Sequence, residues 1–298
     1  MYRKQLPIGY DNFRKIMEEG LFYVDKTKMI KDILDSRGQV MQFTRPRCFG
    51  KTLNLSMLRY YFEREYDMQG AVVDNSRLFE GLAIMDFGEK YKKEMGAYPV
   101  ISLSLKSAKQ PTFEMAYASM LDEIAEEYRR HVYILEKKGL LESEKERYCR
   151  IMEREATPIE YAKSLVFLSA CLAKTERQNV IILIDEYDVP LENAYFKGFY
   201  QEMIDFIRSL FESALKTNDY LKFAIITGCL RISKESIFTG LNNLKVVSVL
   251  DEGYAEHFGF TQTEVSSMLA YFGLQAKQNE IKDWYNGYLF GSTEVYNP

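Results

Sequence analysis

Histidine is scarce in this sequence of 298 residues, which contains only two. They are His131 and His257, and neither has a second metal-type ligand at the spacing of a metal site. His131 follows two arginines in a helical pattern, so we expect a packing or surface position for it. Histidine is therefore not expected to act as a general base, and carboxylates, lysine and bound ions would have to carry any reaction.

Paired cysteines are also missing. The chain has four cysteines, far apart and without a CxxC pair: Cys48, Cys149, Cys171 and Cys229. This spacing supports neither a disulfide framework nor a zinc site. We expect these cysteines to be reduced and mostly buried.

Long apolar runs and a strong charge of one sign are absent as well. The N-terminal residues MYRKQLPIGYDNFRK lack an apolar signal segment, and runs such as 180–184 are far shorter than the roughly 20 residues of a membrane helix. The formal net charge of -4 gives no support to direct nucleic-acid binding. We therefore expect a cytoplasmic protein with neither a membrane nor a nucleic acid as its direct partner.

The chain does contain enough apolar residues for a folded core, since 47% of it is hydrophobic and 28% is charged. Five short runs predict strands, and some are continuous apolar segments typical of a strand covered on both faces. They are residues 39–44, 98–105, 180–184, 221–227 and 245–250. Helical periodicities lie between them. This alternation predicts an α/β fold with a mostly parallel five-stranded sheet flanked by helices.

The loop TRPRCFGKT, residues 44–52, ends like a phosphate-binding loop, or P-loop. Gly50-Lys51-Thr52 matches the end of GxxxxGK[ST], but Arg45 stands where the first glycine belongs. A strand pattern precedes the loop and a helix pattern follows it, as such a site requires. Gly50 would let the backbone approach phosphates, Lys51 would reach the β- and γ-phosphates, and Thr52 would ligate Mg²⁺.

The other residues of this loop compensate for its altered start. Pro46 presets a tight turn, and Arg45 and Arg47 would add positive charge beside the phosphates. With Cys48 and Phe49 they complete the predicted cofactor-binding loop. The alternative is a basic turn before an ordinary helix.

A second motif is VIILIDEYD, residues 180–188. A buried strand ending in Asp185-Glu186 delivers carboxylates to the sheet edge where open α/β sheets bind ligands. Asp185 would hold Mg²⁺ opposite Thr52, and Glu186 would orient and activate the attacking water. Asp188 is either a turn former or a support for Asp185.

A third motif is the strand LKFAIIT, which runs into GCLRISKESIF. One P-loop class places an extra strand between the strands of these two motifs and ends the fourth strand in sequence with a polar sensor; Thr227 stands there. Arg231 would reach the γ-phosphate as a sensor or finger, because a guanidinium offers rigid paired donors. The alternative for Arg231 is a surface arginine after the turn at Gly228.

Upstream of the first strand, GLFYVDKTKMIKDIL offers Tyr23 as an aromatic surface for an adenine ring. Simple core packing is the more frequent role of such aromatics.

With these residues identified, the chain resembles the bacterial AAA-ATPase-like family. The resemblance rests on five blocks in order: LPIGYDNFRKIMEEGLFYVDKTKMI, FTRPRCFGKTLNLSMLRYYFE, VIILIDEYDVPL, IITGCLRISKESIFTGLNNL and WYNGYLFGSTEVYNP. The resemblance spans nearly the whole chain. The family loop usually reads RPRRFGKT, so Cys48 replaces the second arginine of its RR pair and removes the charge that would contact a phosphate at this position.

This resemblance implies an ATP-binding P-loop domain with a small helical lid, and it gives Lys51, Thr52, Asp185 and Glu186 the phosphate and Mg²⁺ roles described above. Many relatives continue into a restriction-type PD-(D/E)xK nuclease domain, and this chain ends where they would go on. We expect no nuclease activity from these residues.

Three parts of the chain are expected. Residues 1–38 would pack on a P-loop ATPase core at 39–250, which carries a helical insertion near 106–175. After residue 250 the pattern changes to helices without strands, with Thr261 and Glu264 spaced as a capping box. This predicts a helical lid at 251–298. We expect Trp284 and Tyr285 in its core; the alternative is a docking face for a downstream domain.

The leading functional hypothesis is an ATPase that hydrolyses Mg-ATP to move the lid or a partner. Its turnover would be low if a homo-oligomer neighbour or a protein partner must supply the finger arginine. The alternative is a nucleotide-gated switch or scaffold with little hydrolysis, which Arg45 in place of glycine favours. A small-molecule kinase is disfavoured, since no arginine follows Leu250 to hold an acceptor.

Overall fold

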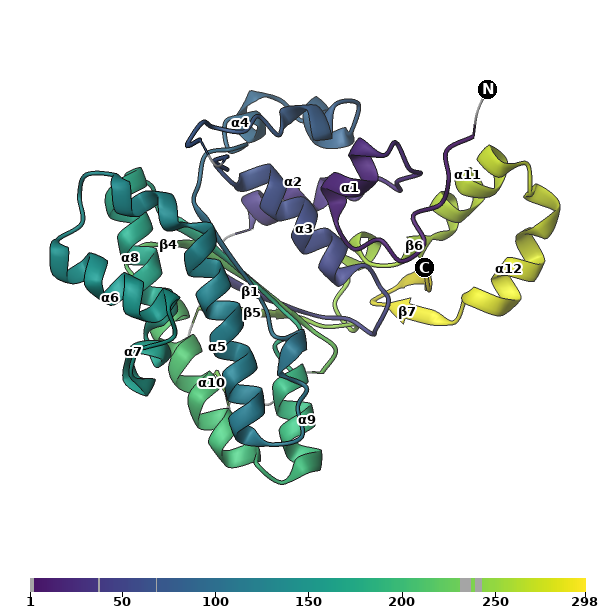
Figure 1. Cartoon of the computed structure of the whole chain (residues 1–298). Coiled ribbons are helices and arrows are strands. Elements are labelled where there is room, and N and C mark those ends of the chain that lie inside the picture. The colour runs from purple at the N-terminus through teal and green to yellow at the C-terminus, as the bar shows by residue number, and fades with distance from the viewer. Residues whose placement is uncertain (1–2, 37, 68, 231–236, 239–242) are drawn as a thin grey trace.

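The computed structural model describes residues 3–36, 38–67, 69–230, 237–238 and 243–298, and a twisted sheet lies at its centre (Figure 1). Its five strands are all parallel, in the order β2-β3-β4-β1-β5. In chain order they are β1 (Val40–Thr44), β2 (Val100–Ser104), β3 (Val180–Asp185), β4 (Leu221–Gly228) and β5 (Leu244–Val247). The predicted α/β fold with a five-stranded parallel sheet is confirmed.

The strands form where the sequence has β-branched apolar runs because both faces of this sheet are covered. Every residue of β1 and β3 is buried. Alternate residues of β3 point to opposite faces: Val180, Ile182 and Ile184 join one apolar cluster, and Ile181 and Leu183 join the other.

The strand order places β4 between β1 and β3, with Phe43 beside Thr227 and Ile184 beside Ile226. The strands of the two predicted motifs are therefore separated by the strand that ends in the predicted sensor. This strand order matches the P-loop class that the sequence motifs indicated, in which an extra strand lies between the strands of the first two motifs.

Helices cover both faces of the sheet (Figure 1). The apolar cluster on one face includes residues of α5, α6, α8, α9 and α10, and the cluster on the other includes residues of α1, α2 and α3. The bounds of the helices on this sheet are α1 (Phe13–Glu18), α2 (Lys28–Asp35), α3 (Lys51–Phe62), α4 (Glu89–Lys92), α5 (Phe113–Arg130), α6 (Glu142–Met152), α7 (Pro158–Ala162), α8 (Ser164–Glu176), α9 (Val189–Lys197) and α10 (Tyr200–Leu215). Among the described residues, none of the helices has the length and apolar composition needed to cross a bilayer.

The C-terminal segment differs from the expectation of helices without strands. Besides α11 (Gln262–Phe272) and α12 (Gln278–Tyr285), it contains a three-stranded antiparallel sheet in the order β6-β8-β7. Its strands are β6 (Phe260–Thr261), β7 (Tyr288–Phe290) and β8 (Thr293–Tyr296). They escape the sequence pattern because each has only two to four residues.

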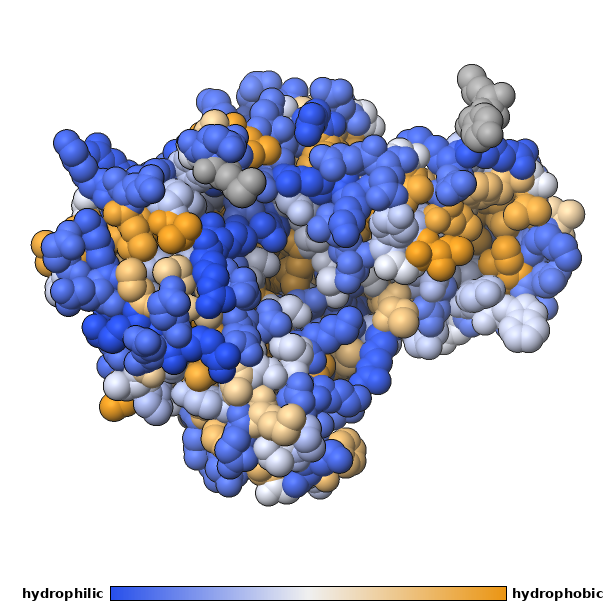
Figure 2. All heavy atoms as spheres, viewed as in Figure 1, coloured by the Kyte–Doolittle hydropathy of each residue, from blue (hydrophilic) through white to orange (hydrophobic). Residues whose placement is uncertain are grey.

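Two predictions for this segment concern the start of α11 and the burial of Trp284 and Tyr285. The capping box is confirmed, since the Thr261 hydroxyl accepts a hydrogen bond from the Glu264 amide and the Glu264 carboxylate accepts one from the Thr261 amide. The expectation that Trp284 and Tyr285 lie in a lid core is wrong, because they are 78% and 53% exposed. Apolar side chains are visible on this part of the surface in Figure 2.

The N-terminal residues hold the C-terminal segment against the sheet. The Lys26 ammonium is buried and bonds to both carboxylate oxygens of Glu264, at 2.6 and 2.7 Å. His257 lies 2.8 Å from the Asp32 carboxylate. The N-terminal residues accordingly run beside α11 in Figure 1, where Arg3 donates to the Phe272 carbonyl and the Lys4 amide donates to the Tyr271 hydroxyl.

A buried group of charged side chains lies at the amino end of β2. Glu127 accepts hydrogen bonds from Arg130 and from the Ser102 amide, and Arg130 also pairs with Glu63. Burial alone would raise the pKa of Glu127, but the Arg130 guanidinium and the His131 ring outweigh it and lower that pKa to about 2. His131 is 2% exposed, and burial and Arg130 lower its pKa, so it has the packing role expected of it.

The Glu127 carboxylate is therefore expected to make stability depend on pH. Because its pKa is lower in the folded chain than the usual 4.5, its contribution is complete above about pH 4.5 and is lost as the pH falls towards 2. Urea denaturation from pH 7 to pH 2 should show that Glu127→Gln removes on the order of 3 kcal/mol of this pH dependence. The exposed Glu126→Gln serves as the matched control. An unchanged pH slope in Glu127→Gln would contradict this assignment.

Candidate functional site

Five of the predicted site residues lie at the carboxyl edge of the sheet, where β1, β3 and β4 end: Lys51, Thr52, Asp185, Glu186 and Thr227. Thr44 pairs with Gly228 at the ends of β1 and β4, and Asp185 is the last residue of β3. This is the edge at which open α/β sheets bind ligands.

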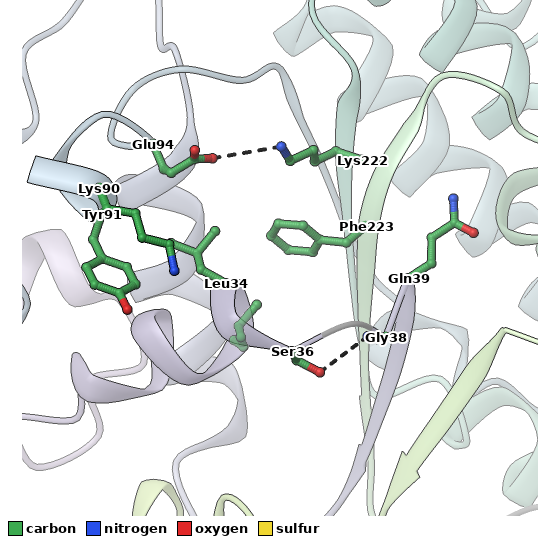
Figure 3. A pocket seen from close by; sticks show the side chains of 10 residues that line it. Leu34, Ser36, Gly38, Gln39, Lys90, Tyr91, Glu94, Lys222 and Phe223 are labelled. Carbon is green, nitrogen blue, oxygen red and sulfur yellow. Dashed lines mark hydrogen bonds and ion pairs between the residues drawn. The ribbon is translucent and has the colours of Figure 1, made fainter.

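A cavity of about 290 Å³ lies at the opposite edge, near the amino ends of β1 and β4 (Figure 3). Gly38, Gln39 and Lys222 line it together with side chains of α2 and α4. Its two lysines already have acidic partners, because Lys90 pairs with Asp35 at 2.6 Å and Lys222 with Glu94 at 4.0 Å. It therefore offers no unpaired cation to a phosphate, and we place the candidate site at the carboxyl edge.

The loop between β1 and α3 makes a tight turn through two left-handed residues. Cys48 has φ 67° and Gly50 has φ 77°, and α3 starts at the next residue, Lys51. At Gly50 a Cβ would meet nothing within 4 Å, so the backbone conformation and not a lack of space favours glycine there. The turn leaves the first amides of α3 at the carboxyl edge, where they suit an anion.

Lys51 folds back over this loop. Its ammonium donates to the carbonyls of Arg45 at 3.0 Å and Pro46 at 2.8 Å, and it lies 3.3 Å from the sulfur of Cys229. Lys51 is only 6% exposed. The ammonium that the sequence assigned to phosphate binding is therefore held against the loop.

Thr52, Asp185 and Thr227 converge from three separate elements. The Thr52 hydroxyl donates to one Asp185 oxygen at 2.6 Å, and the Thr227 hydroxyl donates to the other. The fold thus brings together the residues that the sequence assigned to Mg²⁺ binding and to the sensor, although they lie in motifs far apart along the chain.

This donor set fits Mg²⁺. A hydroxyl and a carboxylate are hard oxygen ligands, and Mg²⁺ commonly takes one or two such protein ligands and completes its shell with water and nucleotide phosphates. Among the described residues there is no group of three or more histidine, cysteine, aspartate or glutamate side chains that could hold a metal alone.

Glu186 follows Asp185 in a left-handed conformation, with φ 52°. Burial and the neighbouring Asp185 carboxylate raise its pKa, while Lys106 opposes the rise. Lys106 lies two residues after the end of β2 and was missed in the sequence analysis. Because β2 lies beside β3 with Ser104 paired with Asp185, knowledge of this strand order would have identified Lys106 as a neighbour of Glu186.

The structure places Arg45 away from the role that the sequence gave it. Its side chain is fully buried, with the guanidinium 5.0 Å from the ring centre of Phe258 and 4.9 Å from that of Phe290. It also donates to the Val247 carbonyl at 3.0 Å, and burial lowers its pKa to about 10. Arg45 therefore joins the loop to the C-terminal segment instead of presenting its charge to phosphates.

The neighbours of Arg45 divide between the surface and the core. Arg47 is exposed and lies 3.3 Å from the Glu192 carboxylate of α9. Cys48 is exposed, whereas the Phe49 ring is buried against Tyr288 and Phe290. The Phe49 side chain therefore belongs to the apolar core and not to the ligand-binding surface of the loop.

Two further candidates have different outcomes. Tyr23 packs its ring on Phe13, and its hydroxyl lies 3.4 Å from the sulfur of Met57, which is the packing alternative given above. Its adenine contact stays a prediction. Arg231 lies outside the described residues, so its sensor role also stays a prediction.

The cysteines are less buried than expected. All four are free, but only Cys171 is buried; Cys48 is exposed, and Cys149 and Cys229 are intermediate. Cys229 is a site residue that the sequence analysis missed, since nothing in the sequence places it beside Lys51.

Comparison with known proteins supports the family suggested by the motifs. The family described as predicted AAA-ATPase matches residues 7–238. A curated protein of Azotobacter chroococcum mcd 1, named "Uncharacterized protein in vnfD 5'region", is 30% identical over 305 residues, which cover 100% of this chain and 51% of that protein. The chain thus spans about half the length of this relative. No solved structure shows a significant match.

Restoring the usual first glycine of the loop is expected to harm the protein. Arg45→Gly removes the guanidinium from between two aromatic rings and leaves a cavity, so urea denaturation should show a loss of roughly 3 kcal/mol. The affinity for ATP should not rise. Arg47→Gly, in the same loop but exposed, should stay within about 0.5 kcal/mol of wild type. Tighter ATP binding by Arg45→Gly at unchanged stability would contradict the role given to Arg45.

Proposed function

The chain belongs to the AAA-ATPase-like family, and we propose that it binds Mg-ATP at the carboxyl edge of the sheet and hydrolyses it to drive a movement of the C-terminal segment or of a partner. The observation that carries this proposal is the convergence of Thr52, Asp185 and Thr227. Separate motifs supply these groups, in the arrangement that phosphoryl transfer uses for a metal and a sensor.

Lys51 is the principal phosphate contact in this proposal. Its ammonium is held by two loop carbonyls and the sulfur of Cys229, so it lies against the phosphate loop. The β- and γ-phosphates replace these neutral partners with anionic oxygens, which are stronger acceptors for an ammonium. The amides at the start of α3 contribute further donors to the same phosphates.

Thr52 and Asp185 would hold Mg²⁺ in this scheme, and the ion would supply positive charge beside the phosphate oxygens. Glu186 orients the attacking water and accepts its proton. Its position next to Asp185, at the end of a buried strand, puts the carboxylate at the sheet edge without an intervening flexible segment. Thr227 stays on Asp185 and orients this carboxylate.

The C-terminal segment is the part of the chain best placed to respond to nucleotide. The Gly259 amide donates to the Phe49 carbonyl at 3.3 Å, and the Asn54 side chain donates to the His257 carbonyl at 2.8 Å. Arg45 adds its contacts to Phe258 and Phe290. A shift of the loop or of α3 on binding phosphate therefore acts directly on residues 257–290.

A switch that binds ATP with little hydrolysis is the second candidate. The left-handed backbone of Glu186 and the buried Arg45 in place of glycine are the features that favour it. An intact Glu186 beside the metal ligand favours hydrolysis.

Substitutions of Lys51 and Glu186 distinguish the two functions. With phosphate release and ATP binding measured on the same samples, Lys51→Ala should lose at least tenfold in affinity, because it removes a charged phosphate contact. Glu186→Gln should keep its affinity and lose about a hundredfold or more in turnover. The exposed Lys138→Ala should match wild type. Binding through Lys51 without phosphate release in wild type would identify a switch, and binding that is indifferent to Lys51 would refute both functions.

The metal role of Thr52 can be tested separately from turnover. Thr52→Val keeps the shape of the side chain but loses the hydroxyl, so its affinity for Mg-ATP should fall about tenfold, while its affinity for ATP in EDTA should change little. Calorimetry with and without Mg²⁺ measures both affinities. An equal loss in the two conditions would show that Thr52 does not act through the metal.

A further inference from the structure

We propose that Tyr187 and Asp188 are positioning residues that hold the turn after β4, residues 227–230, so that Thr227 stays on Asp185 and Cys229 stays on Lys51. This inference rests on the proposed function, and it gives a role to the second half of the DEYD motif. The turn follows directly from the sensor strand, and two of its side chains reach the site.

Tyr187 ties the turn to the sheet. Its side chain is fully buried, its amide donates to the Thr227 carbonyl at 3.1 Å, and its hydroxyl donates to the Leu230 carbonyl at 2.5 Å. The same hydroxyl accepts a hydrogen bond from the Gln42 side chain of β1, also at 2.5 Å. One tyrosine thus connects the strand of the phosphate loop with both ends of the turn.

Asp188 holds the middle of the turn. It is 1% exposed, and one carboxylate oxygen accepts from the amides of Cys229 at 2.8 Å and Leu230 at 2.7 Å. A buried carboxylate that accepts two backbone amides fixes their direction, since charge-assisted hydrogen bonds are stronger than neutral ones.

Gly228 shows how closely these residues approach the turn. A Cβ at this position would lie 2.5 Å from Cε1 of Tyr187 and 2.6 Å from Oδ1 of Asp188. There is no room for a side chain here, so the tyrosine and the aspartate pack directly on the backbone.

The phosphate loop contacts the turn from its other side. The Arg45 amide donates to the Gly228 carbonyl at 3.0 Å, and the Lys51 ammonium lies 3.3 Å from the Cys229 sulfur. The turn therefore lies between the phosphate loop and the DEYD motif. Loosening its support should change the positions of the Thr227 and Cys229 side chains together, while the metal ligand Asp185 stays in its strand.

The test compares Tyr187→Phe with Tyr195→Phe. The first variant loses only the hydroxyl and keeps the ring that packs 5.6 Å from Phe238; the second makes the same change at a 70% exposed position of α9. For Tyr187→Phe we expect kcat to fall roughly tenfold or more with KM changed less than about twofold. The lost hydroxyl would disturb the alignment of the catalytic groups and leave the contacts that bind ATP in place. Asp188→Asn is the second variant and should show the same split.

The cysteines supply a second measurement that needs no hydrolysis. Alkylation by iodoacetamide, followed by mass spectrometry of each peptide, reports separately on the exposed Cys48, the intermediate Cys229 and the buried Cys171. In Tyr187→Phe and Asp188→Asn the rate at Cys229 should rise several-fold relative to wild type, while the rates at Cys48 and Cys171 stay unchanged.

The outcomes separate this inference from the proposed function. A selective rise at Cys229, with the kcat loss where turnover is present, supports the positioning role. A rise that includes Cys171 means that the variants only destabilise the fold, and an unchanged rate at Cys229 means that the turn does not depend on these residues; either result overturns the inference. If wild type releases no phosphate, the proposed hydrolysis fails, but the alkylation rates still decide the positioning role.

Discussion

The hydrogen bond from Thr52 to Asp185 is the contact on which the whole site depends. It joins the first residues of α3 to the end of β3, although β4 lies between β1 and β3. The two groups meet because parallel strands deliver all their carboxyl ends to one edge, and because β4 ends in a threonine that bonds to the same carboxylate. Every other assignment follows from this meeting point: Lys51 is one residue before Thr52, Glu186 is one residue after Asp185, and the Tyr187–Asp188 pair faces the turn that follows Thr227.

The strands of the main sheet and the central site residues could be predicted because they depend on short-range patterns. Continuous apolar runs specify strands buried on both faces, and the order of the motifs along the chain fixed which strand ends meet. Arg45 could not be placed in this way. Its neighbours Phe258 and Phe290 are far away in sequence, and spacing alone does not tell which way a side chain points. Lys106 and Cys229 were missed for the same reason. The three C-terminal strands were missed because they are too short to show an alternating pattern.

The C-terminal segment is held by contacts on two sides, and these contacts limit how it can move in the proposed cycle. On one side the phosphate loop and α3 contact it through Arg45, Phe49 and Asn54. On the other side the N-terminal residues hold it through the Lys26–Glu264 pair, whose ammonium is largely withdrawn from water. A buried ion pair costs desolvation and depends on close geometry, so the segment cannot move far from the N-terminal residues without breaking it. Motion is therefore easier as a joint displacement of both ends of the chain relative to the sheet.

The buried position of Arg45 also has a consequence for the order of folding during synthesis. A guanidinium that loses its water must find its stacking partners and its acceptor carbonyl at the same time, and one of those partners, Phe290, lies in β7 near the end of the described chain. On the ribosome the phosphate loop emerges early. The Arg45 side chain cannot be fully buried, however, until the strands of the C-terminal sheet have left the exit tunnel. Contacts of such long sequence separation form slowly, because loop closure must precede them. The nascent chain would accordingly display an incomplete phosphate loop until the residues of β7 have emerged from the ribosome.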